Sequence, residues 1–559
     1  MKKLPNGISD YQRLIEDNYV YVDKTKYIEK LEDLSAPYLM FLRPRKFGKT
    51  LFTSVLENYY DILKKDNFEK LFSETYIGKN PTKNKNSYHI LKFNFSGIDT
   101  SSIEKTMQSF KNTVIESIKH FIVVYNLDFY INENQDAEEI LNSVFTAFDL
   151  QKTNEKIYVI IDEYDHFANE LLGFHTEDFK QLVSKNGKVR KWYEILKKGT
   201  EKIVDRIFIT GVAPITLDSF TSGFNISKDI TRDSRFNEMI GFTKAELIGL
   251  MDYQGISKEE QEKILPIMKE NYDGYNFSEE SHEFIYNSNM SLYFLSEYIA
   301  FGKPPTRLVD VNIASDYSKL GKMLDLCKGE EKQRLTEDSV SGKGITLQLV
   351  EKFNPATEFK EEEMVSMLYY LGYLTISGNV ADYPILKIPN KVMKEIYSDY
   401  FLKVVREQFN IDLDVNYSTL AIEIALEGKI DKTVELLEKY LNHLSNRDFS
   451  RFDEKYVKLI FYCIAMNLTI FNVKSEMEVQ RKYPDLLIVP KKIEADYDSV
   501  MIEFKYLKKG EENRLKEKQE EARKQIEEYA EFEEIKMIKK LRKYTVVAVV
   551  DKIYVEEIY

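Results

Sequence analysis

The stretch Met40-Phe-Leu-Arg-Pro-Arg-Lys-Phe-Gly-Lys-Thr-Leu51 decides how the N-terminal half of this chain folds. It continues an apolar run that starts at Tyr38, and it ends in Gly48-Lys49-Thr50 directly before a helical pattern. A loop of this kind between a strand and a helix holds phosphate oxygens on its backbone N–H groups, with its lysine on the outer phosphates and its hydroxyl on Mg²⁺. The residues predicted to bind nucleotide are Arg43, Arg45, Lys46, Phe47, Gly48, Lys49 and Thr50, with Thr50 also a Mg²⁺ ligand.

The loop departs from the pattern G-x-x-x-x-G-K-[ST] at its first position, where Arg43 replaces glycine. A turn with a charged rim is the alternative interpretation of this stretch. The strand before it and the helix after it favour the phosphate-binding interpretation, because the motif requires that context.

Two further apolar segments support a nucleotide site. Ile157–Ile161 is a near-continuous apolar run that ends in Asp162-Glu163, which is typical of a central parallel strand buried on both faces. Asp162 is predicted to hold the Mg²⁺ water shell, and Glu163 to polarise the water that attacks the γ-phosphate. Ile207–Thr210 ends in a hydroxyl that either reads the γ-phosphate or is an ordinary strand end.

Strands alternate with helices up to about residue 250, which predicts an α/β fold with a parallel sheet covered on both sides. The predicted strands are Tyr38–Leu42, Ile90–Phe95, Ile157–Ile161 and Ile207–Thr210. The predicted domains are a nucleotide-binding domain at 1–242, a helical lid at 243–302, a helical and winged-helix-like bridge at 303–440, and an α/β domain at 441–559.

The winged-helix-like part is expected from the helix Glu361–Leu371, the strand Ile385–Ile388 and a helix after Pro389-Asn390. Such a module can bind DNA, but its face is not strongly basic. A structural bridge between the flanking domains is therefore favoured.

Charged residues stand at the ends of two apolar strands near the C-terminus. Pro484-Asp485 precedes one strand, and Ser499–Lys505 forms the second, in which Glu503 and Lys505 project from the same face because side chains alternate. If the two strands pair, Asp485 approaches that face, and Asp485 and Glu503 can hold one or two Mg²⁺ or Mn²⁺ ions. The ion would lower the pKa of a bound water, and Lys505 would orient or activate that water against a phosphodiester. Two strands with ordinary charged ends are the alternative.

Two further catalytic candidates lie on helices. Glu454 opens an apolar helix, where it is either an extra acid of the site or an acid favoured by the helix dipole. Gln525 lies one turn before Tyr529 on a helix predicted from Glu511 to Glu534. That helix is otherwise dense in Glu and Lys, so the pair can also belong to a solvated surface.

These motifs resemble a large microbial family in which an AAA-ATPase-like domain is joined to a C-terminal nuclease-like domain of the PD-(D/E)xK type. The resemblance covers nearly the whole chain, and the family's own loop accepts the arginine at position 43. It implies that Pro484-Asp485 with Glu503-Phe-Lys505 forms the nuclease motif, that Gln525 and Tyr529 form a Q-x-x-x-Y helix, and that Asp23-Lys24-Thr25 borders the nucleotide. The N-terminal motifs are Leu4-Pro-Asn-Gly-Ile-Ser-Asp10, Tyr21-Val-Asp-Lys-Thr25, Arg43-Pro-Arg-Lys-Phe-Gly-Lys-Thr50, Ile161-Asp-Glu-Tyr-Asp165, Ile209-Thr-Gly-Val212, Gly241-Phe-Thr243 and Tyr272-Asp-Gly-Tyr-Asn-Phe277.

Composition sets outer limits on these predictions. A net charge of −13 over 559 residues argues against a protein uniformly coated for nucleic acid, although a local basic groove remains open. Two isolated cysteines exclude a Cys-rich zinc site and fit a reducing cytoplasm. No signal pattern or membrane-length apolar run is visible, so a cytoplasmic protein without a membrane partner is expected. The residues expected around the nuclease site are Lys491, Lys492, Lys505, Lys508, Lys509 and Arg514.

The first functional hypothesis is an ATPase with a Mg²⁺-dependent nuclease domain that cleaves nucleic acid, with DNA as the favoured substrate. Defence against foreign DNA or action on mobile elements is its candidate setting, and a homo-oligomer is one open assembly state. The second hypothesis is a nucleotide-switched regulator whose nuclease fold is silent and only binds nucleic acid or protein. The intact Glu503 and Lys505 pair favours the first.

Overall fold

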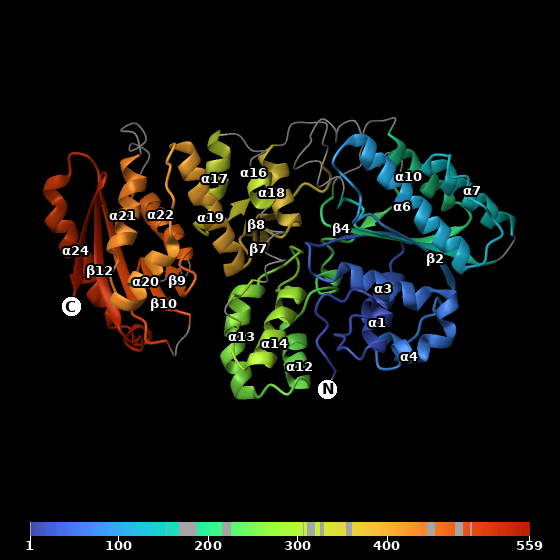
Figure 1. Cartoon of the computed structure of the whole chain (residues 1–559), viewed down its shortest axis with the longest axis horizontal. Coiled ribbons are helices and arrows are strands. Elements are labelled where there is room, and N and C mark those ends of the chain that lie inside the picture. Colours follow the sequence, from blue (N-terminus) through green and yellow to red (C-terminus); the bar gives the residue numbers. More distant parts are fainter. Residues whose placement is uncertain are drawn as a thin grey trace. The chain divides into compact units, whose positions relative to one another are not determined.

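The computed structural model describes residues 2–151, 154–166, 187–214, 225–305, 307–309, 319–324, 329–353, 360–443, 453–475, 484–491 and 495–559. The chain divides into two compact units, which are considered separately. The first contains Met1–Cys327 and Thr346–Val392, and the second contains Lys328–Ile345 and Met393–Tyr559. The predicted α/β class is confirmed, with a parallel sheet in the N-terminal part, a helical middle and a second sheet in the C-terminal part (Figure 1).

The first unit is built on a five-stranded sheet in the order β2-β3-β4-β1-β5, in which every neighbouring pair is parallel. The register sets Asn94 beside Asp162 and Leu42 beside Gly211, so the carboxyl ends of four strands meet at one edge. The four strands predicted from sequence are confirmed within a few residues. Their bounds are β1 Tyr38–Leu42, β2 Tyr88–Asn94, β3 Lys156–Asp162, β4 Val204–Gly211 and β5 Lys228–Asp229.

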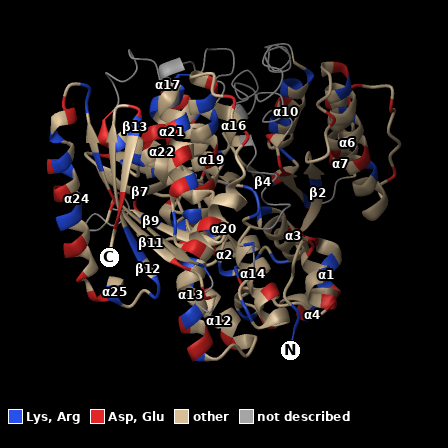
Figure 2. Cartoon of the chain, turned by 60° about the vertical axis from the view of Figure 1, so that its left-hand side comes forward, with Lys and Arg blue, Asp and Glu red and all other residues tan. Residues whose placement is uncertain are grey.

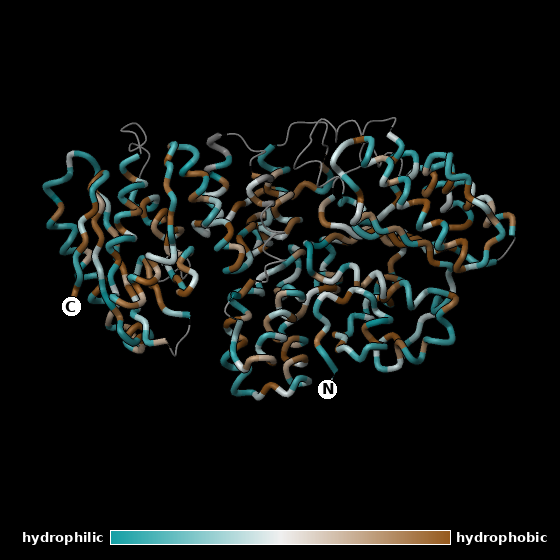
Figure 3. Tube along the Cα trace, viewed as in Figure 1, coloured by the Kyte–Doolittle hydropathy of each residue, from teal (hydrophilic) through white to brown (hydrophobic). Residues whose placement is uncertain are grey.

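Helices cover both faces of this sheet. Figure 1 shows α6, α7 and α10 over one face and α1, α3 and α4 over the other. Apolar residues gather along the strands and the inward faces of these helices (Figure 3), and Trp192 of α10 is fully buried against Phe93. The bounds are α1 Tyr11–Glu16, α2 Lys26–Glu32, α3 Lys49–Tyr60, η1 Ile62–Asn67, α4 Phe68–Phe72, α5 Tyr76–Lys79, α6 Ile103–Val124, α7 Ala137–Leu150 and α10 Lys188–Gly199.

Three helices follow the sheet, in the region predicted as a lid. The first begins with a capping box, in which the Thr243 hydroxyl accepts from the Glu246 N–H and the Glu246 carboxylate accepts from the Thr243 N–H. A helix, a hairpin and a second helix come later, in the order expected for a winged-helix-like module. The bounds are η2 Ser234–Phe236, α12 Lys244–Tyr253, α13 Lys258–Tyr272, α14 Ser288–Phe301, α16 Lys319–Leu324, α18 Glu361–Tyr370, β7 Thr375–Val380, β8 Tyr383–Lys387 and α19 Lys391–Gln408.

The second unit contains a mixed five-stranded sheet in the order β13-β12-β11-β10-β9. The pair β11 and β12 is parallel, and the other neighbouring pairs are antiparallel. The strands β10 and β11 pair, with Leu486 beside Ile502, so the condition for Asp485 to approach the face of Glu503 and Lys505 is met. The bounds are β9 Phe471–Ser475, β10 Leu486–Pro490, β11 Ser499–Leu507, β12 Leu541–Val549 and β13 Lys552–Ile558.

Helices lie on both faces of this second sheet as well. Phe461 of α22 packs on Phe504 at one face, while Ile526 of α24 packs with Met501 at the other. Figure 2 shows both signs of charge along α24. The prediction of a single helix from Glu511 to Glu534 is wrong, because this segment forms three shorter helices, η4, α24 and α25. The bounds are α17 Gly329–Val340, β6 Ile345–Thr346, α20 Tyr417–Glu427, α21 Asp431–Asn442, α22 Glu454–Met466, η4 Glu512–Arg514, α24 Leu515–Ala530 and α25 Glu533–Lys536.

No helix in the described ranges is long and apolar enough to cross a membrane. Cys463 is a buried free thiol, as expected for an isolated cysteine, and Cys327 lies outside the described residues.

Candidate active sites in the two units

The predicted phosphate-binding loop connects β1 to α3. Its backbone has positive φ at Lys46 (66°) and at Gly48 (101°), where glycine avoids the steric cost of the left-handed region. Lys49 folds back over the loop and donates to the carbonyls of Arg43 (2.9 Å) and Pro44 (3.0 Å). Burial lowers the pKa of Lys49, and the carboxylates of Glu163 and Asp162 oppose this. The lysine therefore lies between the loop and the two acids predicted to act with it.

The carboxyl edge of the sheet holds buried acceptors that lack partners. Asp162 is fully buried, and among the described residues neither of its carboxylate oxygens has a hydrogen-bond partner of good geometry. The Thr210 hydroxyl is likewise buried without a hydrogen-bond partner among the described residues. Burial raises the pKa of Asp162, although the nearby Thr50 hydroxyl and Lys49 ammonium lower it in part. Unpaired buried acceptors are costly, so these residues fit a bound Mg²⁺ ion and nucleotide that would satisfy them.

Glu163 is held at the same edge with a left-handed backbone (φ 51°). One of its carboxylate oxygens lies 3.3 Å from His166 Nδ1, and the Arg45 guanidinium lies 3.3 Å from the same ring nitrogen. Burial raises the pKa of Glu163, but His166, Lys49 and Arg45 more than offset this and leave it below its usual value. Glu163 therefore stays ionised at neutral pH, as a base or a water-polarising group requires.

A cavity of about 450 Å³ lies beside the loop. Its wall includes His166 and Lys24. Lys24 donates to Glu246 (2.6 Å) and to the Glu238 carbonyl (2.9 Å). The cavity is large enough for a nucleotide and has both charged and apolar walls. Other residues in its wall are Pro5, Gly7, Ile8, Tyr21, Val22, Arg45, Lys46, Phe47, Gly48, Lys49, Thr50, Glu163, Gly241, Ser288 and Leu292.

Two side chains of the loop, Arg43 and Phe47, pack into the protein interior next to this cavity. Arg43 is 1% exposed and donates to the carbonyls of Leu42, Thr231 and Phe236. Its guanidinium lies over the rings of Phe41 and Phe277, 4.3 Å from each centroid. The expectation of nucleotide contacts therefore needs correction for the Arg43 side chain, whose place is that of an anchor for the loop.

Phe47 is buried edge-on against Tyr275 (4.9 Å) and Phe277 (5.6 Å). Its ring touches the wall of the cavity but packs mainly in this aromatic cluster. The two residues fix the start and the middle of the loop to the 272–277 segment of the same unit.

Replacing Arg43 by alanine is expected to destabilise the first unit by about 2–4 kcal/mol, because three buried carbonyls lose a charged donor. Arg43→Lys should recover only part of this loss, since one ammonium cannot reproduce the forked contacts. Urea unfolding followed by Trp192 fluorescence measures the change in the first unit. Equal stability of Arg43→Ala and the unaltered protein would contradict the anchoring role.

Two arginines that follow β4 form salt bridges within the first unit. Arg232 contacts Glu279 and Glu351, and Arg235 contacts Asp233.

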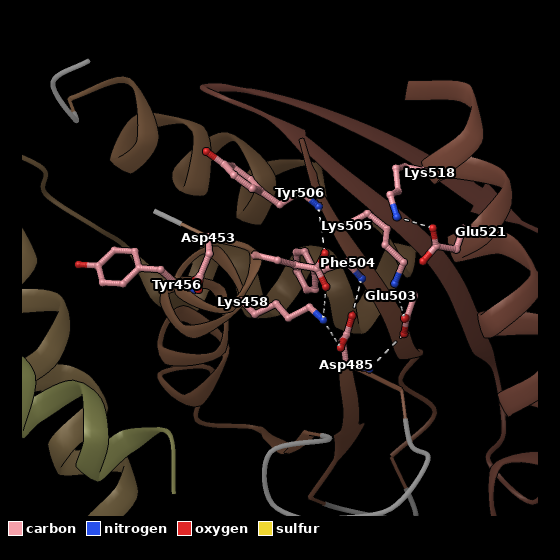
Figure 4. A network of polar contacts seen from close by, with 11 residues as sticks. Asp453, Tyr456, Lys458, Asp485, Glu503, Phe504, Lys505, Tyr506, Lys518 and Glu521 are labelled. Carbon is pink, nitrogen blue, oxygen red and sulfur yellow. Dashed lines mark hydrogen bonds and ion pairs between the residues drawn. The ribbon is translucent and has the colours of Figure 1, made fainter. Parts of the chain in front are cut away.

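The second unit brings Asp485, Glu503 and Lys505 together at the start of β10 and within β11 (Figure 4). Lys505 Nζ lies 2.9 Å from Glu503 Oε1, and the Asp485 N–H lies 3.4 Å from Glu503 Oε2. Asp485 Oδ2 accepts from the Phe504 N–H at 2.8 Å. All three residues are buried, so their charges interact without the screening of bulk water.

Burial and then the Asp485 carboxylate raise the pKa of Glu503, Lys505 only partly opposes them, and the net value is about 7. Two buried carboxylates that repel one another, with oxygen as the sole ligand atom, fit a divalent cation such as Mg²⁺ or Mn²⁺. No group of three or more His, Cys, Asp or Glu side chains with metal-site geometry occurs in the part of the chain that is described. The fit therefore depends on this pair of carboxylates.

Without metal, the C-terminal unit is expected to lose stability as pH rises from about 4.5 to about 7. Folding raises the pKa of Glu503, so the folded state binds this proton more tightly than the unfolded state does. The resulting contribution to the free energy of unfolding is lost as pH rises through the pKa of the folded state. Urea unfolding in EDTA at several pH values, compared with Glu503→Gln, isolates the effect. Parallel pH curves for the two proteins would contradict the raised pKa.

Glu454 and a lysine that sequence reasoning missed complete this site on α22. Lys458 Nζ lies 2.6 Å from Asp485 Oδ1 and 2.8 Å from Glu454 Oε1. Although burial lowers the pKa of Lys458, the Asp485 and Glu454 carboxylates raise it above its usual value. The signal available in the sequence was the position of Lys458, one helical turn after the candidate acid Glu454. A cavity of about 350 Å³ here is lined by Asp453, Glu454, Lys455, Lys458, Tyr462, Asp485, Leu486 and Phe504.

Gln525 lies on α24, which packs on the other face of the sheet from α22. Its Oε1 atom is buried without a hydrogen-bond partner among the described residues, and Tyr529 packs in the core beside Ile526. No recorded hydrogen bond or ion pair joins Gln525 to Glu503 or Lys505, so its catalytic assignment stays a prediction.

The basic residues expected around this site are partly neutralised. Lys491 contacts Glu395 (3.4 Å), and Arg514 contacts Glu511 and Glu517. Lys508 and Lys509 are exposed, and Lys492 lies outside the described residues. The charges of Lys491 and Arg514 are therefore partly offset by neighbouring carboxylates.

Comparison with known families agrees with the two sites. Residues 5–221 match the family described as predicted AAA-ATPase, and residues 452–557 match the PD-(D/E)XK nuclease superfamily. The chain joins a predicted AAA-ATPase domain to a PD-(D/E)XK nuclease superfamily domain. The resemblance drawn from the sequence is thereby confirmed for both domains.

Individual relatives add little to this assignment. An uncharacterized protein in the vnfD 5′ region of Azotobacter chroococcum mcd 1 is 25% identical over 290 residues, which is about half of each chain. A chain in the structure of Drosophila ORC bound to GC-rich DNA and Cdc6 is 11% identical, with coverage of 82% of this chain and 67% of that one. Its TM-score of 0.24 is too low to support an inference.

Proposed function

We propose that this protein binds and hydrolyses ATP in its AAA-ATPase-like domain and cleaves nucleic-acid phosphodiesters, with DNA as the favoured substrate, in its nuclease domain. The observation that carries the nuclease proposal is the buried cluster in which Asp485 and Glu503 lie beside Lys505. A silent fold used only for binding would gain nothing from two repelling acids at this position, because burying them costs free energy.

In the nuclease domain, Asp485 and Glu503 would hold a divalent cation, which supplies Lewis-acid charge and lowers the pKa of bound water. Lys505 holds Glu503 in place through its 2.9 Å contact and presents an ammonium to the anionic phosphodiester. The Phe504 N–H fixes the orientation of the Asp485 carboxylate at 2.8 Å. These contacts pre-organise the acids, which is the condition for electrostatic stabilisation of developing charge.

In the ATPase-like domain, Gly48, Lys49 and Thr50 would receive the phosphates, with Mg²⁺ held near Thr50 and Asp162. Glu163 would polarise the attacking water, since its pKa lies below its usual value and His166 and Arg45 fix its position. The Thr210 hydroxyl, which has no hydrogen-bond partner among the described residues, would donate to a phosphate oxygen.

A cleavage screen tests this proposal. Single- and double-stranded DNA and RNA are incubated with the full chain and Mg²⁺ or Mn²⁺, with and without ATP. Metal-dependent cleavage of at least one substrate is expected, with DNA preferred. Binding of nucleic acid without cleavage under every condition would favour a nucleotide-switched regulator in place of a nuclease.

A further inference from the structure

Lys458 bridges two carboxylates that both lie at the nuclease centre. It is one helical turn after Glu454 on α22, and its ammonium lies 2.8 Å from Glu454 Oε1 and 2.6 Å from Asp485 Oδ1. Its side chain is 20% exposed and reaches into the cavity of about 350 Å³. Figure 4 shows Lys458 approaching Asp485 from the side opposite to Lys505.

Each carboxylate beside the Lys458 ammonium uses one oxygen to accept from a backbone N–H. The second oxygen of Glu454 accepts from the Tyr506 N–H (3.3 Å), and the second oxygen of Asp485 accepts from the Phe504 N–H (2.8 Å). One oxygen of each acid therefore remains, and Lys458 contacts both. A divalent cation between Glu454 and Asp485 would have to displace this ammonium. Between Asp485 and Glu503 no ammonium of the described residues contacts both acids, because Lys505 contacts Glu503 alone of the two.

We propose that Lys458 takes the place of a second divalent cation between Glu454 and Asp485, and so limits the nuclease centre to one ion at Asp485 and Glu503. This inference rests on the proposed metal-dependent function. It assigns Glu454 to holding Lys458 and leaves the ion to the other two acids. Lys458 is a positioning residue in this arrangement, since it fixes Asp485 from one side while the ion is held from the other.

Counting bound Mn²⁺ per chain tests the inference without any activity measurement. Free Mn²⁺ is followed by electron paramagnetic resonance during titration of the nucleotide-free full chain. Ions bound elsewhere on the chain contribute equally to every variant, so the difference in stoichiometry between two variants reports on this site. Lys458→Met should bind one more Mn²⁺ than the unaltered protein. The control is Lys455→Met, an exposed lysine of the same cavity, which should bind as the unaltered protein does.

Equal stoichiometry in Lys458→Met and the unaltered protein would overturn the inference. If Lys458→Met does not fold, Glu454→Gln decides in its place: unchanged Mn²⁺ stoichiometry supports the assignment, and loss of one ion overturns it. Asp485→Asn separates this inference from the proposed function. If Asp485→Asn loses no ion, the metal centre itself fails, whereas loss of an ion there with no gain in Lys458→Met rejects only the role of Lys458.

Discussion

Replacing Lys505 by methionine is expected to lower the rate of metal-dependent phosphodiester cleavage about 10²- to 10³-fold, the usual loss when one pre-organised donor is removed. Lys505 is buried and its Nζ lies 2.9 Å from Glu503 Oε1, so its replacement removes a charged donor from that carboxylate. Methionine keeps the length of the side chain while removing its charge. Initial rates on the best substrate of the cleavage screen measure the effect.

Lys508→Met is the matched control for this change. Lys508 lies three residues further along the chain and is exposed, and no contact of its ammonium with Glu503 or Asp485 is recorded. Its replacement should leave the cleavage rate within about twofold, because a single exposed charge contributes little. A Lys505→Met protein that cleaves as fast as this control would remove Lys505 from the proposed mechanism.

The second large effect is expected in the ATPase-like domain. Lys49→Met should abolish tight ATP binding, because the loop loses the ammonium that now rests on the Arg43 and Pro44 carbonyls. Glu163→Gln should keep ATP binding but lower hydrolysis about 10²- to 10³-fold, since the group that polarises water loses its charge. Fluorescent-nucleotide titration and phosphate release separate the two steps.

Lys65→Met provides the control in the same unit. Lys65 is exposed and does not line the cavity beside the loop, so its replacement should leave ATP binding and hydrolysis unchanged. Normal ATP binding by Lys49→Met, or unchanged hydrolysis by Glu163→Gln, would contradict the proposed nucleotide site.

The strands and their acidic ends were predictable from sequence because local patterns determine them. Near-continuous apolar runs mark buried parallel strands, and Ile157–Ile161 is observed as the core of β3 with Asp162 at its end. Alternation placed Glu503 and Lys505 on one face, and the contact between them follows from that spacing. The approach of Asp485 required pairing of two strands, which sequence could state only as a condition.

Other parts of the sites depend on contacts distant in sequence. From the sequence, Arg43 is expected to be a cation of the phosphate-binding loop. In the structure it donates to the Thr231 and Phe236 carbonyls, nearly two hundred residues away, and anchors the loop. Lys458 was missed because its one local signal, a place one helical turn after Glu454, is also that of an ordinary i,i+4 surface ion pair. Its partner Asp485 lies 27 residues further along the chain. The break after Ala530 was also missed, since the Glu- and Lys-rich pattern continues through it.

The most direct test is the position of a bound ion in crystals of the full chain grown with Mn²⁺. Anomalous scattering should place one Mn²⁺ in contact with carboxylate oxygens of both Asp485 and Glu503, with Lys458 still on Glu454. An anomalous map from well-occupied crystals without an ion at these two acids would contradict the proposed nuclease centre.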